Sequence, residues 1–245
     1  YYVENIPHFL MDIVDPGYFY TVTEFREGAL DAIGRIRASG YLPLMVGGTG
    51  LYISSLVNNL QIPRVPPNKK LRESLEEKPV EHLLRLLEKI DPGSHAVIDH
   101  KNRRRIIRAL EVTIFTGEPF SKLRERGAPL FDALQIGIQV EPETLRKRID
   151  ERVEGMVSAG LWQEVEGLLA QKYRWSIPSM SGIGYRQWKG YTEGTASLAD
   201  VILEMKRATW RYARRQMTWF RRDPKIRWCR TIEEAEAQIE NFLVL

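Results

Sequence analysis

The chain has 245 residues, a net charge of +4 and 43% hydrophobic residues, enough for the core of a domain this size but too few for a membrane protein. No apolar run approaches the ~20 residues that a spanning helix needs, and the N-terminus shows no signal-peptide pattern. The single cysteine, Cys229, excludes a disulfide framework and a cysteine-based metal site, which indicates a reducing, cytoplasmic location.

The first 60 residues predict helix and strand in alternation. Residues 21–39 carry apolar side chains at helical spacing, and Gly40 can end that helix. The apolar run at 41–46 predicts a short buried strand, which ends in a Gly-Gly-Thr-Gly turn at 47–50. A second helix can resume at 51–59. This order of elements is typical of a parallel sheet covered on both faces.

The middle of the chain predicts helices only. A segment with three prolines, 61–67, is interpreted as a linker. Three helical patterns follow, at 71–77, 80–90 and 103–116. Gly117 can end the last of these helices. The polar stretch 124–129, which contains Gly and Pro, predicts the linker that leads back out of this region.

After this linker the strand and helix patterns return. Residues 133–140 (ALQIGIQV) predict a buried strand, which we expect to pair next to residues 44–46. Apolar residues then recur at helical spacing from 145 to 169. Asp200 is the expected N-cap of a long final helix that reaches Arg222.

These patterns divide the chain into two predicted domains. Residues 1–63 and 129–245 are expected to form an α/β core, and residues 64–128 a helical domain inserted into it. We treat the insertion as separate because its helices interrupt an otherwise regular alternation of strand and helix.

The most informative segment, 206–222 (KRATWRYARRQMTWFRR), contains seven cations and no acid. A solvated helix normally includes Glu and Asp, so their omission indicates that a phosphate or another polyanion supplies the negative charge. Arginine outnumbers lysine here, which favours bidentate phosphate contacts. The alternative is an ordinary exposed basic helix. The arginines expected near one helical face are Arg207, Arg211, Arg214, Arg221 and Arg222.

A second group of cations lies in the predicted helical domain. It comprises Lys101, Arg103, Arg104, Arg105 and Arg108. Ile107, Leu110 and Ile114 are expected to form the apolar stripe behind these cations. Two basic helices in different domains could grip one nucleic acid from two sides. The alternative is that Glu111 pairs with Arg108 and that this face is simply solvated.

Two glycine-rich turns are candidate binding loops. The turn at 47–50 ends a predicted strand and allows close backbone approach to an anion, and Thr49 adds a hydroxyl group. In the loop 181–186, Tyr185 could stack on a base and Arg186 could hold a phosphate. For each turn a purely structural role is the alternative. No G-x-x-x-x-G-K-[ST] loop occurs in these 245 residues.

Other chemistry-bearing residues form no recognisable pattern. The four histidines (His8, His82, His95 and His100) lack metal-ligand spacing, so we expect no metal site built by the protein. Trp162, Trp175 and Trp188 are interpreted as packing residues.

Five blocks of sequence together resemble the tRNA dimethylallyltransferase (tRNA isopentenyltransferase) family. They are IPHFLMDIVDP (6–16), LPLMVGGTGLYI (42–53), RRIIRALEVTIFTGEPFS (104–121), IGYRQ (183–187) and RRQMTWFRR (214–222). The resemblance implies a P-loop-kinase-like parallel-sheet core with an all-helical insertion, which together clamp a tRNA anticodon stem-loop. It also implies that the adenine 3′ of the anticodon is flipped out and that its exocyclic amine attacks dimethylallyl diphosphate, with Mg²⁺ on the diphosphate.

The resemblance also assigns roles to residues. Thr49 would lie near the target base, as a catalytic and tRNA-binding residue, and Arg221 would bind the diphosphate of the donor. The other residues expected to bind tRNA are Arg72, Arg104, Arg105, Arg108, Gly184, Tyr185, Arg186, Arg214, Arg215 and Gln216. We expect Arg104, Arg105 and Arg108 to act in tRNA affinity and not in the chemical step. We also expect a monomer that does not associate with membranes.

The chain departs from the family pattern at its start. The family's phosphate-binding loop and the catalytic Asp that follows it precede the IPH block, and neither occurs in this sequence. We therefore expect an N-terminal truncation of roughly 50–60 residues, about one β-loop-α unit. The general base would then lie outside the chain, and the fragment alone would be inactive. Two alternative functions are an isopentenyltransferase for free adenine nucleotides and a non-catalytic RNA-binding module.

Overall fold

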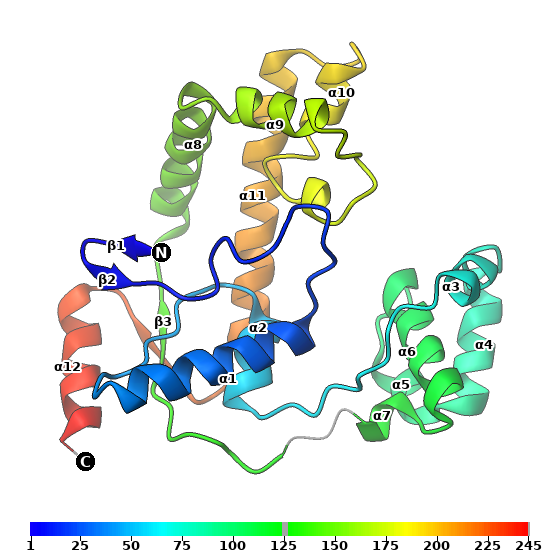
Figure 1. Cartoon of the computed structure of the whole chain (residues 1–245), viewed down its shortest axis with the longest axis horizontal. Helices are drawn as coiled ribbons and strands as arrows, with labels where there is room; N and C mark the ends of the chain where they lie inside the picture. The colour runs from blue at the N-terminus through cyan, green and yellow to red at the C-terminus, as the bar shows by residue number, and fades with distance from the viewer. Residues whose placement is uncertain (124–126, 245) are drawn as a thin grey trace. The chain divides into compact units, whose positions relative to one another are not determined.

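The computed structural model describes residues 1–123 and 127–244 (Figure 1). Contacts divide the chain into two compact units. The first unit comprises Tyr1–Thr21, Val46–Gly50 and Ala133–Leu245, and the second comprises Val22–Met45 and Leu51–Asp132. The predicted domains, 1–63 with 129–245 and 64–128, are not tested by this division and stay a prediction. Within the predicted linker 124–129, residues 124–126 lie outside the described residues.

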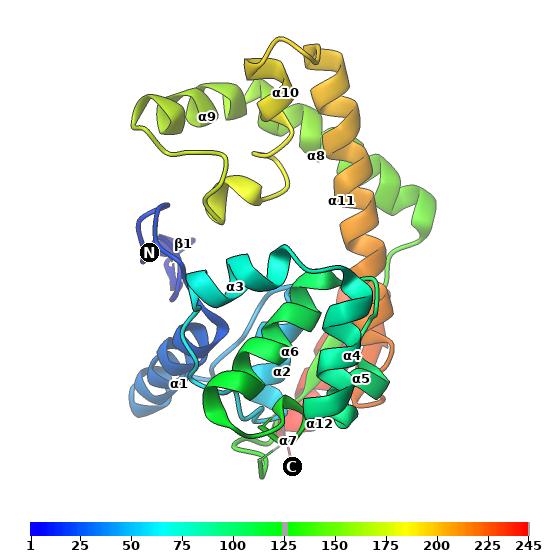
Figure 2. The ribbon, with the colours of Figure 1, turned by 90° about the vertical axis from the view of Figure 1, so that its right-hand side faces the viewer.

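The second unit is helical in its described part. Its elements are α1 (Val22–Ala38), α2 (Gly50–Val57, whose first residue belongs to the first unit), α3 (Lys69–Glu76), α4 (Val80–Ile90), α5 (Pro92–Val97), α6 (Arg103–Thr116) and α7 (Phe120–Leu123). In Figure 2, α4 lies against α6. Leu83 and Leu87, one turn apart on α4, are fully buried against Leu110 and its neighbours on α6.

Local signals fix the ends of the helices in this unit. Asn102 caps α6 by accepting a hydrogen bond from the backbone N–H of Arg105 (3.2 Å), and Gly117 ends the helix at a φ of 75°. The Arg103 side chain donates to the carbonyl oxygens of Leu75, Glu76 and Lys78, at the end of α3 and just beyond it. Arg103 is therefore a structural residue of α3 and α6.

Ring stacking and a part-buried arginine join α1 to α2 and to the residues just after it. The rings of Phe25 on α1 and Tyr52 on α2 stack with centroids 4.2 Å apart. The Arg26 side chain donates to the Asn59 side-chain oxygen (2.5 Å) and to the Ser55 carbonyl oxygen (3.2 Å). The predicted helices at 21–39 and 51–59 are confirmed.

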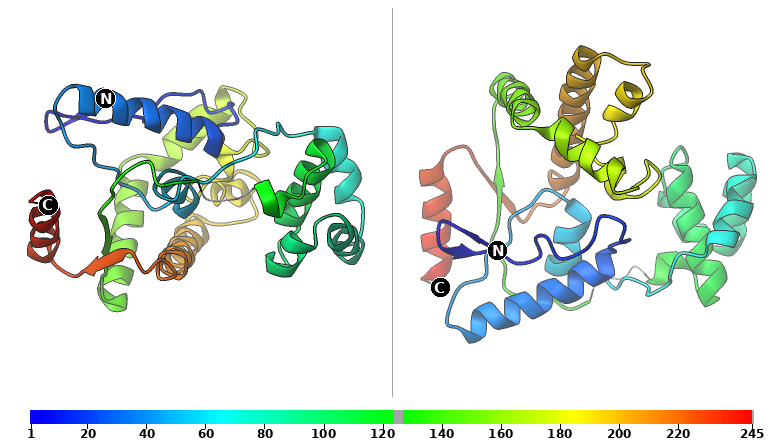
Figure 3. Two further views of the ribbon diagram at one scale, coloured as in Figure 1. Left: turned by 90° about the horizontal axis from the view of Figure 1, so that it is seen from below. Right: turned by 45° about the horizontal axis from the view of Figure 1, so that its top comes forward.

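The first unit combines helices with short strands. Its elements are β1 (Tyr2–Val3), β2 (Ile6–Pro7), β3 (Gln135–Ile138), α8 (Pro142–Ser158), α9 (Leu161–Ala170), the 3₁₀ turn η1 (Ser179–Ser181), α10 (Trp188–Thr192), α11 (Leu198–Phe220), β4 (Ile226–Cys229) and α12 (Ile232–Leu243). β1 and β2 pair antiparallel, whereas β3 and β4 pair parallel with Gln135 opposite Ile226. The architecture is thus mixed α/β and rich in helix. Figure 3 shows β4 leading into α12.

The core of the first unit lies between α8, α9, α10 and α11. Figures 1 and 2 show α8 running beside α11, and Val153 and Met205 bury their side chains in this contact. Trp188 is fully buried, with its ring centroid 5.2 Å from that of Trp162, and Trp175 packs against the same cluster. The interpretation of the three tryptophans as packing residues is confirmed.

The strand predicted at 41–46 does not form. This segment has no regular structure, and Leu44 and Val46 are 80% and 86% exposed. A strand needs a neighbour for its backbone N–H and C=O groups, and no described strand lies alongside this segment. The strand predicted at 133–140 is confirmed as β3, but it pairs with β4 and not with residues 44–46.

The start of the final long helix was also predicted wrongly. Ser197, not Asp200, is the N-cap of α11, and its hydroxyl accepts from the Asp200 backbone N–H (3.2 Å). The Asp200 carboxylate accepts in return from the Ser197 N–H (2.9 Å), which completes a capping box. The helix ends at Phe220, so Arg221 is its C-cap and Arg222 lies beyond it. No helix in the described part of the chain is long and apolar enough to cross a membrane.

Candidate functional site

The Gly-Gly-Thr-Gly turn lies directly against α11 within the first unit. The Gly48 carbonyl oxygen accepts hydrogen bonds from the Gln216 side-chain amide (3.0 Å) and from the Tyr212 hydroxyl (3.4 Å). A Cβ atom at Gly48 would overlap the Gln216 side chain, and one at Gly50 would overlap the Trp219 ring. At Gly50 the indole ring leaves no room for a larger residue, whereas at Gly48 the flexible Gln216 side chain would have to move aside. The structure thus joins two segments that are far apart in the sequence.

Exposed cations lie near Gln216 along α11. The side chains of Arg214, Arg215 and Arg221 are exposed, as is Thr49 in the turn. Arg215 also places its guanidinium 5.7 Å from the centre of the Tyr212 ring. Within the described residues, none of these three arginines forms an ion pair with an acidic side chain. They are available to an anion from solution.

Two of the seven cations in 206–222 are neutralised by the chain itself. Lys206 donates to Glu154 on α8 (2.6 Å), and this hydrogen bond raises the pKa of the Lys206 ammonium. Arg211 pairs with Glu204, which lies on α11 just before the acid-free stretch (2.5 Å). The acidic partners lie outside residues 206–222. The free positive charge of the helix is therefore lower than the sequence of this stretch alone indicates.

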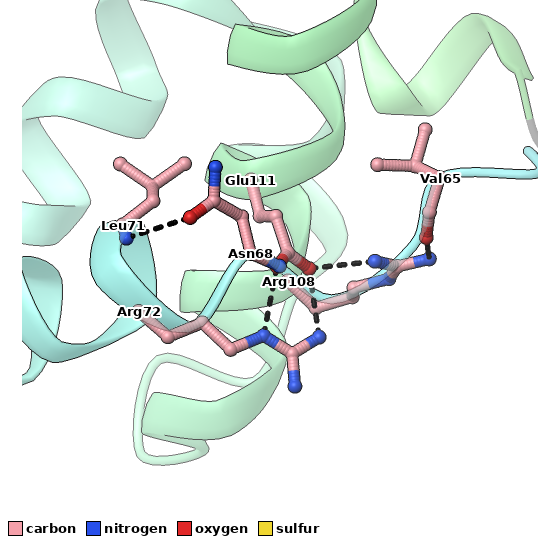
Figure 4. Close-up of polar contacts among 6 residues, drawn as sticks. All are labelled: Val65, Asn68, Leu71, Arg72, Arg108 and Glu111. Atoms are coloured by element: carbon pink, nitrogen blue, oxygen red, sulfur yellow. Dashed lines mark hydrogen bonds and ion pairs between the residues drawn. The ribbon is translucent and has the colours of Figure 1, made fainter. Parts of the chain in front are cut away.

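One cation of the second group, Arg108, and Arg72 on α3 are both held by a buried carboxylate, Glu111 on α6 (Figure 4). Arg72 on α3 donates to both oxygens of Glu111, from Nε to Oε1 (2.8 Å) and from Nη2 to Oε2 (2.7 Å). Arg108 donates to Oε2 (2.6 Å) and also to the Val65 carbonyl oxygen (3.0 Å). The Asn68 backbone N–H donates to Oε1 (2.7 Å). The pairing of Glu111 with Arg108, which the sequence left as an alternative, is present.

These contacts keep Glu111 ionised. Burial of the side chain would raise its pKa, but the hydrogen bonds from Arg72, from the Asn68 N–H and from Arg108 outweigh it and hold the pKa below its ordinary value. The carboxylate therefore carries its charge at neutral pH and fixes both guanidinium groups.

Two other arginines of α6 reach the surface without an acidic partner in the described part of the chain. Arg104 and Arg105 are exposed and form no ion pair among the described residues. The apolar stripe behind them differs from the prediction at one position, because Ile114 is 47% exposed. Ile106, which follows Arg105 directly, is fully buried together with Leu110.

In the loop at 181–186, two of the three candidate residues, Gly184 and Tyr185, have structural roles. Gly184 has a φ of +104°, and its N–H donates to the Gln187 side-chain oxygen (3.0 Å). Tyr185 packs on the core cluster, and its hydroxyl donates to Glu164 (2.6 Å). Burial, and then this hydrogen bond, raise the pKa of Tyr185 to about 12. Arg186 is exposed.

Sequence reasoning did not assign Glu111, Tyr212 or Trp219 to the site. A signal for the last two existed: Tyr212, Gln216 and Trp219 are spaced by four and three residues and so share one face of α11. That face meets the glycine turn.

Comparison with known proteins identifies the family. A sequence model of the IPP transferase family matches residues 2–223. The chain belongs to the IPP transferase family. It is 44% identical over 224 residues to the tRNA dimethylallyltransferase of Chloroflexus aggregans, a match that covers 90% of this chain and 76% of that one. The resemblance found in the sequence is therefore confirmed.

Solved structures of the family have the same fold. The full-length tRNA isopentenylpyrophosphate transferase of Bacillus halodurans matches with a TM-score of 0.68 and 33% identity, over 98% of this chain and 78% of that one. A eukaryotic dimethylallyltransferase, described as acting on tRNA, matches with a TM-score of 0.77 and 26% identity, over 98% of this chain and 64% of that one.

Proposed function

We propose that this family member is a tRNA dimethylallyltransferase. It transfers a dimethylallyl group from dimethylallyl diphosphate to the exocyclic amine of the adenine 3′ of the anticodon, giving isopentenyladenosine in tRNA. The proposal is supported by the names of its relatives and by one observation above all. The contact between Gly48 and Gln216 brings the glycine turn, with Thr49, to the part of α11 that carries the free arginines.

In the proposed reaction the amine nitrogen bonds to the allylic carbon while that carbon's bond to the diphosphate oxygen breaks. The diphosphate leaves with the electron pair, and the amine loses one proton. Arg221 is assigned to the departing diphosphate, because a fixed cation there stabilises the negative charge that develops. Thr49 is assigned to the target base through its hydroxyl group. No residue of the chain is assigned as the general base.

The proposed tRNA interface has two parts. In the first unit it comprises Thr49, Gly184, Tyr185, Arg186, Arg214, Arg215 and Gln216, and in the second unit Arg72, Arg104, Arg105 and Arg108. Residues of this kind hold phosphates through guanidinium groups and backbone N–H groups, and bases through stacking. Because Tyr185 is packed on the core and only partly accessible, its proposed contact with tRNA uses the part of the side chain that the core leaves accessible.

The proposed architecture is a P-loop-kinase-like parallel-sheet core of residues 1–63 and 129–245 with a helical insertion of residues 64–128. Support comes from the parallel pairing of β3 with β4 and from the separate helical core around Leu83 and Leu87. We further propose that the protein acts as a monomer, in the cytoplasm where its tRNA substrate lies.

The resemblance implies Mg²⁺ on the diphosphate. The described residues contain no group of three or more His, Cys, Asp or Glu side chains that could hold a metal ion. They do not fit a site built by protein ligands, so we assign Mg²⁺ no residue and derive no step through it. We propose that it binds to the oxygens of the donor and to water, the ligands that Mg²⁺ favours beside phosphates.

The test is made in the source organism. Deleting the gene that encodes this chain should remove isopentenyladenosine and its derivatives from tRNA, as measured by mass spectrometry of tRNA nucleosides. Restoring the gene should restore the nucleoside. Unchanged tRNA in the deletion strain would overturn the proposed function, and loss of free prenylated adenine nucleotides alone would support the alternative substrate.

A further inference from the structure

Glu111 is a buried carboxylate of the helical region that binds two arginine side chains. Its side chain is fully buried, yet Arg72 and Arg108, which donate to it, are each 32% exposed. One buried carboxylate therefore holds two guanidinium groups at the surface. Because the two arginines carry two positive charges and Glu111 one negative, the group keeps a net charge of about +1 towards solvent.

The hydrogen bonds leave part of each arginine unused. Arg72 uses Nε and Nη2 on Glu111, and its Nη1 makes no hydrogen bond within the described residues. Arg108 uses Nη1 and Nη2, and its Nε is similarly unused. Figure 4 shows the two guanidinium groups reaching the carboxylate from α3 and α6, one on each side.

We propose that Glu111 is a positioning residue for substrate binding, which holds Arg72 and Arg108 ready for a phosphate of the tRNA backbone; this rests on the proposed function. Without the carboxylate the two like charges repel each other, and each long side chain regains its rotational freedom. Binding a phosphate would then require both arginines to be ordered again, which weakens binding. Glu111 does not touch the substrate.

The rival explanation is that Glu111 only stabilises the fold. The same carboxylate accepts from the Asn68 N–H at the start of α3, and Arg108 reaches the Val65 carbonyl oxygen, so the cluster also ties the chain before α3 to α6. To separate the two explanations, a control variant must disturb a comparable buried carboxylate. It must leave the hydrogen bonds of Arg72 and Arg108 unchanged.

Asp91 supplies that control. Its carboxylate is also fully buried in the helical region, but its partners are the backbone N–H groups of Ser94 and Ser121 (both 3.0 Å) and the Ser121 hydroxyl (2.5 Å). Asp91→Asn therefore disturbs a buried carboxylate in the same region while it leaves Arg72 and Arg108 in place.

The experiment compares Glu111→Gln with Asp91→Asn in the protein expressed from its natural gene. Affinity for tRNA is measured by filter binding over a range of salt concentrations, with steady-state kinetics for tRNA and for dimethylallyl diphosphate. We expect Glu111→Gln to weaken tRNA binding about tenfold, equivalent to one charge-assisted hydrogen bond. Its plot of log affinity against log salt should be less steep by about 1, as for one lost phosphate contact. The KM for the donor should not change.

Asp91→Asn should leave the tRNA affinity, its salt slope and the KM for the donor unchanged. This should hold even if it lowers the melting temperature as much as Glu111→Gln does. In a protein that already lacks both arginines, Glu111→Gln should weaken binding further by less than about twofold. If Glu111→Gln unfolds the helical region, Glu111→Asp keeps the buried charge but withdraws it by one methylene, and the same loss of tRNA affinity is expected.

An unchanged salt slope in Glu111→Gln, or an equal loss of affinity in Asp91→Asn, would overturn the proposal. So would a tenfold effect of Glu111→Gln in the protein without Arg72 and Arg108. The wild-type protein separates this result from the proposed function: tRNA binding without prenylation would refute the prenyl transfer alone, and absence of tRNA binding would refute the role of Glu111.

Discussion

Arg221 occupies the C-cap of α11, where its backbone N–H donates to the carbonyl oxygens of Met217 and Trp219. The C-terminal end of a helix carries partial negative charge, which on its own would repel a diphosphate. Arg221 and the following Arg222 are both exposed, and their two positive charges make the local charge at this end of α11 positive. The ring of Trp219 lies against Gly50 and anchors the last turn of α11. The Arg221 side chain therefore extends from a fixed backbone position.

Replacing Arg221 should therefore affect the prenyl donor first. We expect Arg221→Ala to lose about 30- to 1000-fold in kcat/KM for dimethylallyl diphosphate, the range seen when one fixed donor to a developing charge is removed. Affinity for tRNA should fall much less, because other cations share that contact. Arg221→Lys should restore only part of the loss, since an ammonium lacks the planar fork of a guanidinium.

Arg207 provides the matched control for this substitution. It is an exposed arginine of the same helix, 14 residues before Arg221 and so about 21 Å away along the axis. Arg207→Ala should leave the donor kinetics unchanged. Normal donor kinetics in Arg221→Ala, together with poor tRNA binding, would place Arg221 in the tRNA-binding set instead.

The hydroxyl of Tyr185 illustrates how the structure limits a predicted role. Because burial and the hydrogen bond to Glu164 raise its pKa to about 12, the phenol is neutral throughout the physiological range. The stability that this raised pKa contributes is complete below the ordinary pKa of tyrosine and is lost as the pH rises towards about 12. No pH effect near neutrality is expected from this residue.

At the scale of single elements, helices were predictable wherever the signals were local. The predicted ranges 80–90 and 103–116 coincide with α4 and α6, because apolar spacing, an Asn cap and a terminal Gly all lie within the helix or beside it. The start of α11 was misplaced by three residues because Ser197 and Asp200 cap each other, and only the geometry shows which is the N-cap.

Strands and the site were less predictable because they depend on distant partners. The run at 41–46 and the segment of β4 are both short and apolar in part, yet only β4 has a strand beside it. The Gly48–Gln216 hydrogen bond joins residues 168 positions apart, which no spacing rule can detect. The resemblance named the correct segments, but the contact between them comes from the structure.

The exposed arginines of α6 carry a prediction at this scale. Replacing Arg104 and Arg105 together by Ala should weaken tRNA binding and reduce its salt slope by up to about 2, with kcat at saturating tRNA retained. Arg85→Ala is the control, because Arg85 is exposed on α4 of the same helical region and has no assigned role. A normal salt slope in the double variant would mean that this face of α6 is only solvated.

At the scale of the whole molecule, the part of the chain that the structure describes has two hydrophobic clusters that share no residue. One cluster is built on α3, α4 and α6 around Leu83 and Leu87, and the other on α8 to α11 around Trp188 and Met205. Each cluster buries its own apolar surface, so each can stabilise its helices without the other. The proposed binding residues are distributed over the surfaces of both.

Separate clusters predict separate unfolding. Leu83→Ala should destabilise the helical region by about 2–5 kcal/mol, as measured by amide hydrogen exchange with mass spectrometry, because a fully buried leucine leaves a cavity. Exchange should accelerate in α3, α4 and α6 and remain unchanged in α8 to α11. Met205→Ala, at an equally buried site of the other cluster, should give the reverse pattern. Equal acceleration in both regions for either variant would show that the two clusters unfold as one cooperative unit, and the insertion would then not be an independent domain.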